Sequence, residues 1–186
     1  ELKPKLISGR SYEEELRWLS ERAFGYAETG YHTAILLPSH QDIRYFLRNL
    51  CEQQGVNSSF VRDKEPGEWE VNYYNEINFG LRNAGLPIRY LGNGAGSLKV
   101  SATEKIVNLI TYHSAKGLDF EVTFLPFLTK ERYMPSGNIP GENLFFVALT
   151  RAREQMFLSY NSANPHRFLG MIDRSCLVTA TAAEEL

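Results

Sequence analysis

The sequence has little of what marks secreted, membrane-bound or metal-stabilised proteins. Only two cysteines, Cys51 and Cys176, occur in its 186 residues, and its four histidines are as widely scattered. This distribution argues against a disulfide framework or a structural zinc site, so we expect no bound metal and a reducing, cytoplasmic location. No stretch approaches the roughly 18 apolar residues that a membrane-spanning helix needs, so no membrane partner is expected.

Charge of one sign is not in excess either. The chain has 20 Lys and Arg residues against 22 Asp and Glu residues, a formal net charge of -2. A strongly basic balance is the usual sign of a domain that binds nucleic acid over a large surface. Any contact with DNA must therefore be local and depend on a few side chains.

A phosphate loop is also missing. No Gly-Lys pair occurs in the chain, although a phosphate site made by one domain needs a glycine-rich loop that ends in Gly-Lys-Ser/Thr. The turn 92–97 is rich in glycine but leads into Leu98 without a clear helix, so we interpret it as a flexible surface turn. The apolar runs 33–37 and 122–125 end in proline rather than in carboxylates that could hold magnesium. We therefore expect no complete ATP hydrolysis site here.

What is present is an alternation of strand-length apolar runs with helical patterns. Ser11 and Glu14 have the spacing of a helix-opening capping box, and the run 33–37 is typical of a parallel strand covered on both faces. The alternation predicts an α/β fold with a mostly parallel sheet flanked by helices. The predicted strands are 3–8, 33–37, 88–91, 106–110, 122–125 and 156–160, and the predicted helices are 11–29, the segment between Pro38 and Gly55, 73–84, 142–154 and a short helix opened by Asn164 and Pro165.

Three polar segments are candidates for chemistry, because ligands in open α/β sheets sit near the carboxyl ends of strands. Lys116, Arg151 and Arg153 are the natural anion-seeking groups, and a guanidinium can neutralise charge on a transferred phosphoryl group. Taken alone, two such arginines on a helix are more often solvated charges near its end, and His113 is also compatible with a polar residue at the end of a strand. The three segments are 39–41, 111–117 and 147–153.

Two longer stretches carry a resemblance to a known family. Residues 110–125, ITYHSAKGLDFEVTFL, resemble motif V of the UvrD/Rep/PcrA-like superfamily 1 DNA helicases, and residues 143–158, NLFFVALTRAREQMFL, resemble their motif VI. Residues 33–50 are more weakly similar to the strand and helix that open the same domain, and residues 164–168 to its closing segment. The resemblance reaches most of the chain, and 56–72 is its least certain part.

The resemblance implies a RecA-like, P-loop NTPase-like fold that lacks its own phosphate loop. Residues 1–186 would form the C-terminal RecA-like domain of a longer protein, and the start at Glu1 rather than at a methionine suggests an excised domain. Residues 56–100 would be a shortened form of the region in which the family often inserts a further domain. ATP and Mg²⁺ would be held mainly by the N-terminal RecA-like domain of the same protein.

The resemblance also assigns roles to single residues. Arg151 would be the catalytic arginine finger that reaches the γ-phosphate. Gly117 and Asp119 would face the nucleotide ribose and complete the ATP-binding set with Arg151. Asp119 stands where the family usually has glutamate, one methylene longer, which puts a direct contact from this position in doubt.

DNA would bind elsewhere on the same domain. The resemblance places four polar residues on a surface that holds single-stranded or partly duplex DNA through its phosphates. The implied function is the second motor domain of an ATP-dependent helicase, inactive as an isolated chain. Two alternatives stay open, an ATP-independent helicase-like module that binds protein or DNA, and the motor part of a helicase-nuclease. The DNA-binding residues would be Ser39, His113, Ser114 and Lys116.

Overall fold

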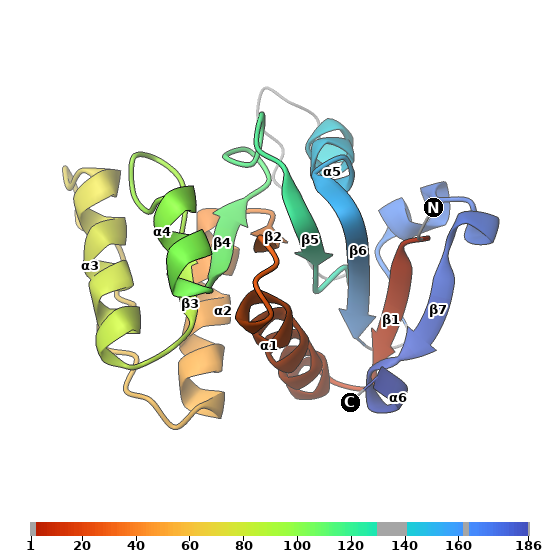
Figure 1. The fold of residues 1–186 in the computed structure, drawn as a ribbon, viewed down its shortest axis with the longest axis horizontal. Coiled ribbons are helices and arrows are strands. Elements are labelled where there is room, and N and C mark those ends of the chain that lie inside the picture. Colours follow the sequence, from red (N-terminus) through yellow and green to blue (C-terminus); the bar gives the residue numbers. More distant parts are fainter. Residues whose placement is uncertain (1–2, 130–140, 162–163, 186) are drawn as a thin grey trace.

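A computed structural model describes residues 3–129, 141–161 and 164–185 of the chain (Figure 1). The strands are β1 (Lys5–Gly9), β2 (Thr33–Leu37), β3 (Ile88–Tyr90), β4 (Val107–Thr111), β5 (Phe120–Leu125), β6 (Ala152–Asn161) and β7 (Val178–Thr181). The helices are α1 (Tyr12–Glu28), α2 (His40–Gln53), α3 (Glu70–Asn83), α4 (Leu98–Glu104), α5 (Gly141–Leu149), α6 (Ala182–Glu185) and the short 3₁₀ helices η1 (Arg167–Met171) and η2 (Arg174–Cys176).

The seven described strands form one sheet in the order β3-β4-β2-β5-β6-β1-β7. Every pairing between them is parallel. The predicted α/β class with a mostly parallel sheet is thus confirmed. Because all strands run the same way, the sheet has one edge at which strands begin and an opposite edge at which they end. We call these the amino edge and the carboxyl edge.

Helices bury both faces of this sheet (Figure 1). Along β2, Ile35 and Leu37 belong to one hydrophobic core with α1, α2 and α3, whereas Ala34 and Leu36 belong to a second core with α5 and η1. This division follows from the strand geometry, since successive side chains point to opposite faces. All five residues of β2 are buried, as the continuous apolar run predicted.

The predicted cap of the first helix is present in modified form. The Ser11 hydroxyl accepts a hydrogen bond from the Glu14 amide at 3.2 Å, and α1 ends at the C-cap Thr29. The Glu14 carboxylate does not reach back to the Ser11 amide. It accepts instead from the backbone N–H of Arg10 at 2.6 Å and from its guanidinium at 2.6 and 2.9 Å.

The predicted helix 142–154 is wrong at its carboxyl end, and the error concerns the site. Helix α5 stops at Leu149, and β6 begins at Ala152, so Arg151 lies in the connection and Arg153 lies on a strand. The reason is tertiary pairing. The amide of Phe120 donates to the carbonyl of Arg151, and β6 continues beside β5 from there. A contact between distant segments overrides local helix propensity.

Two other predictions fail at the ends of elements, and one strand was missed. The turn 92–97 leads into a helix after all, since Ser97 caps the short α4. The closing helix is a 3₁₀ helix capped by His166 rather than by Asn164. Strand β7, which pairs with β1 at the sheet margin, was not predicted; its four residues are mostly exposed and have no apolar run. The loop predicted at 126–141 lies largely outside the described residues.

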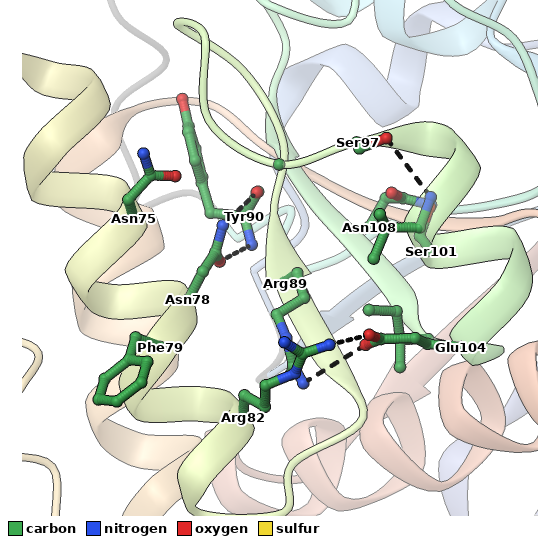
Figure 2. A pocket seen from close by; sticks show the side chains of 13 residues that line it. Asn75, Asn78, Phe79, Arg82, Arg89, Tyr90, Ser97, Ser101, Glu104 and Asn108 are labelled. Carbon is green, nitrogen blue, oxygen red and sulfur yellow. Dashed lines mark hydrogen bonds and ion pairs between the residues drawn. The ribbon is translucent and has the colours of Figure 1, made fainter.

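The margin of the sheet at β3 is closed by a side chain. The amide of Tyr90 donates to Asn78 Oδ1 at 2.7 Å, and Asn78 Nδ2 donates to the Tyr90 carbonyl at 3.0 Å (Figure 2). Asn78 thus occupies both backbone groups as a further strand would, which protects the margin from pairing with another chain. Beside it, α3 and α4 enclose a groove of about 280 Å³, closed at one end by ion pairs of Arg82 and Arg89 with Glu104.

Replacing Asn78 by alanine is expected to destabilise the chain by about 1–3 kcal/mol, because both backbone groups of Tyr90 lose their partners. Asn75→Ala is the matched control, since Asn75 lies on the same helix and lines the same groove but is exposed. The measurement is the free energy of unfolding in urea, compared between variants whose m-values, the slopes of that free energy against urea concentration, are equal. Equal stability of the two variants would show that Asn78 does not close the margin.

Candidate functional site

The predicted site residues fall into two groups at opposite edges of the sheet. Asp119 immediately precedes β5 and Arg151 precedes β6, so both lie at the amino edge. Ser39 follows β2, and His113 and Ser114 follow β4, so these lie at the carboxyl edge. The connection 112–119 joins β4 to β5 and runs from one edge to the other, with Lys116 and Gly117 along it. Sequence order alone did not reveal this division.

At the amino edge, Arg151 is held by several groups of its own chain. Its Nε donates to the carbonyl of Val147 at 2.9 Å, and its Nη1 donates to the carbonyl of Leu118 at 3.1 Å. Its Nη2 donates to the Thr150 hydroxyl at 2.8 Å. Only 19% of the Arg151 side chain is exposed. The guanidinium therefore ties the end of α5 to the connection that precedes β5.

Asp119 is shared between the two arginines. Its Oδ1 lies 3.4 Å from Arg151 Nη1, and its Oδ2 lies 3.4 Å from Arg153 Nη2. The structure thus brings together Asp119 and Arg151, which were predicted to act on the nucleotide, and it places the exposed Gly117 two residues before Asp119. Gly117 has φ of +82°, a conformation that side chains disfavour. The Arg151 guanidinium can bind an anion that competes with its partly exposed carboxylate partner.

At the carboxyl edge, a compact cluster surrounds His40. Its Nδ1 is hydrogen-bonded to the Tyr74 hydroxyl, and the rings of Tyr74 and Tyr90 stack with centroids 3.6 Å apart. Burial lowers the pKa of His40, although Glu70 acts in the opposite direction. Burial also raises the pKa of Tyr90 to about 12, against the effect of a hydrogen bond with Ser114. Burial therefore favours the neutral forms of His40 and Tyr90.

The glycine-rich turn 92–97 packs into this cluster, contrary to the prediction of a flexible surface turn. A Cβ atom on Gly92 would lie 3.1 Å from Ser114 Oγ, and one on Gly96 would lie 2.3 Å from the carbonyl oxygen of Tyr90. Glycine is required at these positions because other chain segments approach so closely. Asn93 Nδ2 donates to Glu70 Oε2 at 2.5 Å, which ties the turn to the start of α3.

The predicted DNA-binding residues have different environments. The Ser39 hydroxyl caps α2, accepting from the Asp42 amide at 3.2 Å and donating to the Asp42 carboxylate at 2.6 Å. Ser114 Oγ accepts a hydrogen bond from the Thr111 hydroxyl at 3.0 Å, and the Ser114 hydroxyl is also hydrogen-bonded with Tyr90. His113 and Lys116 are exposed.

Several cluster residues were missed by sequence reasoning. His40 stood inside the candidate segment 39–41 but was given no role. Tyr74, Tyr90 and Asn93 come from α3, β3 and the turn after it, and they reach His40 only through the fold. The only available signal was the density of glycines in the turn 92–97.

The chain does not fit the whole of a bound nucleotide. A phosphate loop occupies the connection from a strand to the next helix in its fold class, and here the first such connection is residues 10 and 11. The backbone N–H and guanidinium of Arg10 are already bound to Glu14, and this carboxylate would repel a phosphate. Among the described residues, no three His, Cys, Asp or Glu side chains come together in a group that could hold a metal ion. Of the groups described at the amino edge, the guanidinium of Arg151 is suited to a phosphate that another domain holds.

Parts of this sequence, and its fold, are similar to those of known proteins. Residues 88–163 match the family of UvrD-like helicase C-terminal domains. These residues, less than half of the chain, are therefore similar to a UvrD-like helicase C-terminal domain, and we call the domain that contains them the UvrD-like domain. The matched range includes every predicted site residue except Ser39.

Two curated relatives agree with this assignment. A protein named "Probable DNA helicase" from Mycoplasma pneumoniae is 40% identical over 93 residues, which cover 41% of this chain and 17% of that protein. A "Probable DNA helicase II homolog" from Mycoplasma genitalium is 34% identical over 84 residues, which cover 37% of this chain and 12% of that protein. The UvrD-like domain thus matches less than a fifth of either relative's length.

A solved structure shares the fold of the UvrD-like domain. The C-terminal domain of a possible DNA helicase from Lactobacillus plantarum WCFS1 superimposes with a TM-score of 0.62 over 96% of this chain and 85% of that one, at 12% identity. The all-parallel sheet with helices on both faces is accordingly a RecA-like α/β fold. No helix within the described ranges is long and apolar enough to cross a membrane.

Proposed function

We propose that this chain is the second motor domain of an ATP-dependent superfamily 1 DNA helicase. One observation supports this most strongly. Asp119 and Arg151 lie at the amino edge, His113 and Ser114 lie at the carboxyl edge, and one short connection links them. A motor must couple a nucleotide site to a DNA site, and residues 112–119 join two candidate sites of that kind.

In this proposal the amino edge faces ATP held by the N-terminal RecA-like domain of the same protein. That domain supplies the phosphate loop and the carboxylate for Mg²⁺, which neutralises the β- and γ-phosphates. Arg151 is the arginine finger, and closure of the two domains exchanges its partner Asp119 for the γ-phosphate. Gly117 and Asp119 lie against the ribose. Asp119 also keeps both arginines in place while no phosphate is near.

The carboxyl edge is the track for single-stranded DNA. Lys116 and His113 are exposed and can approach phosphates, and the half-buried Ser114 lies in the same turn. Ser39 presents the start of α2, at which backbone N–H groups favour an anion. These contacts hold the backbone of the strand and read no bases. They suit a translocating motor because such a motor must act on every sequence.

The connection 112–119 transmits motion between the edges. Its first turn is anchored by the bonds of Thr111 with Ser114, at 3.0 Å between hydroxyls and 3.2 Å to the amide. Its far end is anchored by Arg151 on the carbonyl of Leu118. When Arg151 leaves this carbonyl for a phosphate, the connection loses an anchor, and the DNA-facing turn is freed to shift.

The direct test uses the 186-residue chain itself. We expect no ATP turnover above background with single-stranded DNA, because the phosphate loop is absent, and we expect weak, salt-dependent binding of oligothymidylate. His113→Ala and Lys116→Ala should weaken that binding, and Arg153→Ala at the opposite edge should not. Appreciable ATP turnover by the chain alone would contradict the proposal that it holds only part of an ATP site. An unchanged affinity for oligothymidylate in His113→Ala and Lys116→Ala would contradict the proposed DNA track.

One observation favours the alternative of an ATP-independent helicase-like module. Arg151 is bound on all sides by Val147, Leu118, Thr150 and Asp119, which is also what a purely structural arginine would do. The sequence upstream in the parent protein separates the two functions. A Gly-Lys-Ser/Thr loop and an acidic pair there support the motor, and a domain without them supports the module.

A further inference from the structure

Trp69 occupies a position that a tryptophan does nothing to stabilise. It is the N-cap residue of α3, and its side chain makes no capping hydrogen bond. Serines at the same position of α1, α2 and α4 each accept one. Trp69 is also 76% exposed, whereas Trp18 is completely buried between the sheet and its own helix. Ser, Thr, Asp and Asn are the residues that stabilise an N-cap.

Trp69 borders the carboxyl edge that the proposed function assigns to DNA. The next residue, Glu70, is bonded to Asn93, whose amide lies 3.4 Å from His40 Nε2. A Cβ atom on Gly94 would lie 3.5 Å from Val71, so the turn after β3 packs on the first turn of α3. Trp69, which directly precedes Glu70, therefore lies at the end of α3 that contacts the turn after β3.

We propose that Trp69 is a stacking platform for one unpaired nucleobase of the strand that the carboxyl edge holds. This inference rests on the proposed function, because it extends the DNA track beyond the phosphate contacts. A large exposed ring that weakens the local helix signal and adds nothing to the core indicates a role outside the fold. Aromatic side chains bind single strands without sequence preference, because every base offers a π face.

The surroundings favour a base over a phosphate at this point. Glu70 is acidic, and its neighbour Asn93 is neutral, so a phosphate would be repelled here. The cationic and donor groups of the track, Lys116, His113 and Ser114, lie along the connection after β4. A strand whose phosphates follow that connection can direct its uncharged bases toward Trp69.

Intrinsic fluorescence reports on Trp69 directly. The chain has two tryptophans, and only Trp69 is accessible to a ligand. Titration with oligothymidylate should quench the exposed indole, because a base stacked on an indole quenches its emission. An abasic oligonucleotide of equal length has the phosphates without the bases. It should bind more weakly and leave the emission unchanged.

Variants separate stacking from charge. Trp69→Ala should weaken binding of oligothymidylate by about 5- to 150-fold, the loss expected for one stacked base. The slope of log K against log salt should stay constant, because stacking releases no counterions. Lys116→Ala should reduce that slope by about 0.7 for one lost phosphate contact on a single strand.

Two further variants control for structure. Phe79→Ala removes an aromatic residue that is 66% exposed on the same helix, about 15 Å from Trp69 along the axis, and should leave binding unchanged. Trp69→Ser supplies the missing cap, so it should raise the urea midpoint while it weakens binding. If Trp69 had a structural role, Trp69→Ser would lower both the urea midpoint and the affinity for oligothymidylate.

The outcomes distinguish the two proposals. Binding that falls in Lys116→Ala and His113→Ala but stays unchanged in Trp69→Ala overturns the stacking platform and leaves the track intact. Quenching by the abasic strand equal to that by oligothymidylate also overturns it. Failure of the unaltered chain to bind any oligonucleotide overturns both.

Discussion

Replacing Arg151 by alanine in the full-length parent protein should lower kcat for DNA-stimulated ATP hydrolysis by about 10³-fold or more, with ATP binding largely retained. An arginine finger contributes about 10³ to 10⁵ in rate because it neutralises charge that develops in the transition state. It contributes little to the ground state, so the loss appears in kcat. Steady-state turnover at saturating DNA and a nucleotide titration of the same variant provide the measurement.

Arg153→Ala is the matched control for this prediction. Arg153 shares Asp119 with Arg151, but 68% of its side chain is exposed, and it lies on β6 rather than at its start. Loss of its exposed ion pair should change little. If kcat of Arg151→Ala equals that of the unaltered protein, Arg151 has only the structural role seen in its contacts with Val147 and Leu118. The chain would then suit the ATP-independent module.

Replacing Glu15 by leucine should destabilise the chain by about 3 kcal/mol, about 1 kcal/mol for each of three buried or half-buried donors that lose their acceptor. Glu15 is completely buried in α1. Its carboxylate accepts from the Phe127 amide at 2.7 Å, the Ser159 hydroxyl at 2.6 Å and the Asn161 side-chain amide at 2.7 Å. It thus binds the carboxyl ends of β5 and β6 to the first helix.

Glu13→Leu is the control for Glu15, because Glu13 is an exposed carboxylate in the same turn of α1. The free energy of unfolding of Glu13→Leu should differ from that of the unaltered chain by no more than about 0.5 kcal/mol, as for most surface substitutions. The free energy of unfolding in urea is the measurement for both variants. Similar stabilities for the two would mean that the three donors find other partners when Glu15 is removed.

The example of Glu15 shows why part of the tertiary structure was hidden in the sequence. Glu13, Glu14 and Glu15 are identical side chains in succession at the start of a helix, and local rules treat all three as favourable charges at its amino end. In the structure Glu13 is exposed, Glu14 binds Arg10, and Glu15 is buried. Their roles differ because the helix turns about 100° per residue against a sheet.

The sequence by itself determined the strands and helices that have strong internal patterns. The apolar run of β2 and the three- and four-residue spacing in α2 are local properties, so they predicted elements that the structure confirms. The two motif-like stretches likewise identified the UvrD-like domain before any fold was known. The absence of a Gly-Lys pair required only the sequence.

Only the tertiary structure decided where the functional groups lie. Pairing of β6 with β5 ended α5 before Arg151 and placed that arginine beside Asp119 at the amino edge. Packing of α3 and the turn 92–97 brought Tyr74 and Asn93 to His40 at the carboxyl edge. These contacts join residues that are tens of positions apart. Short-range patterns cannot encode them, because they depend on strand order and on which helix covers which face.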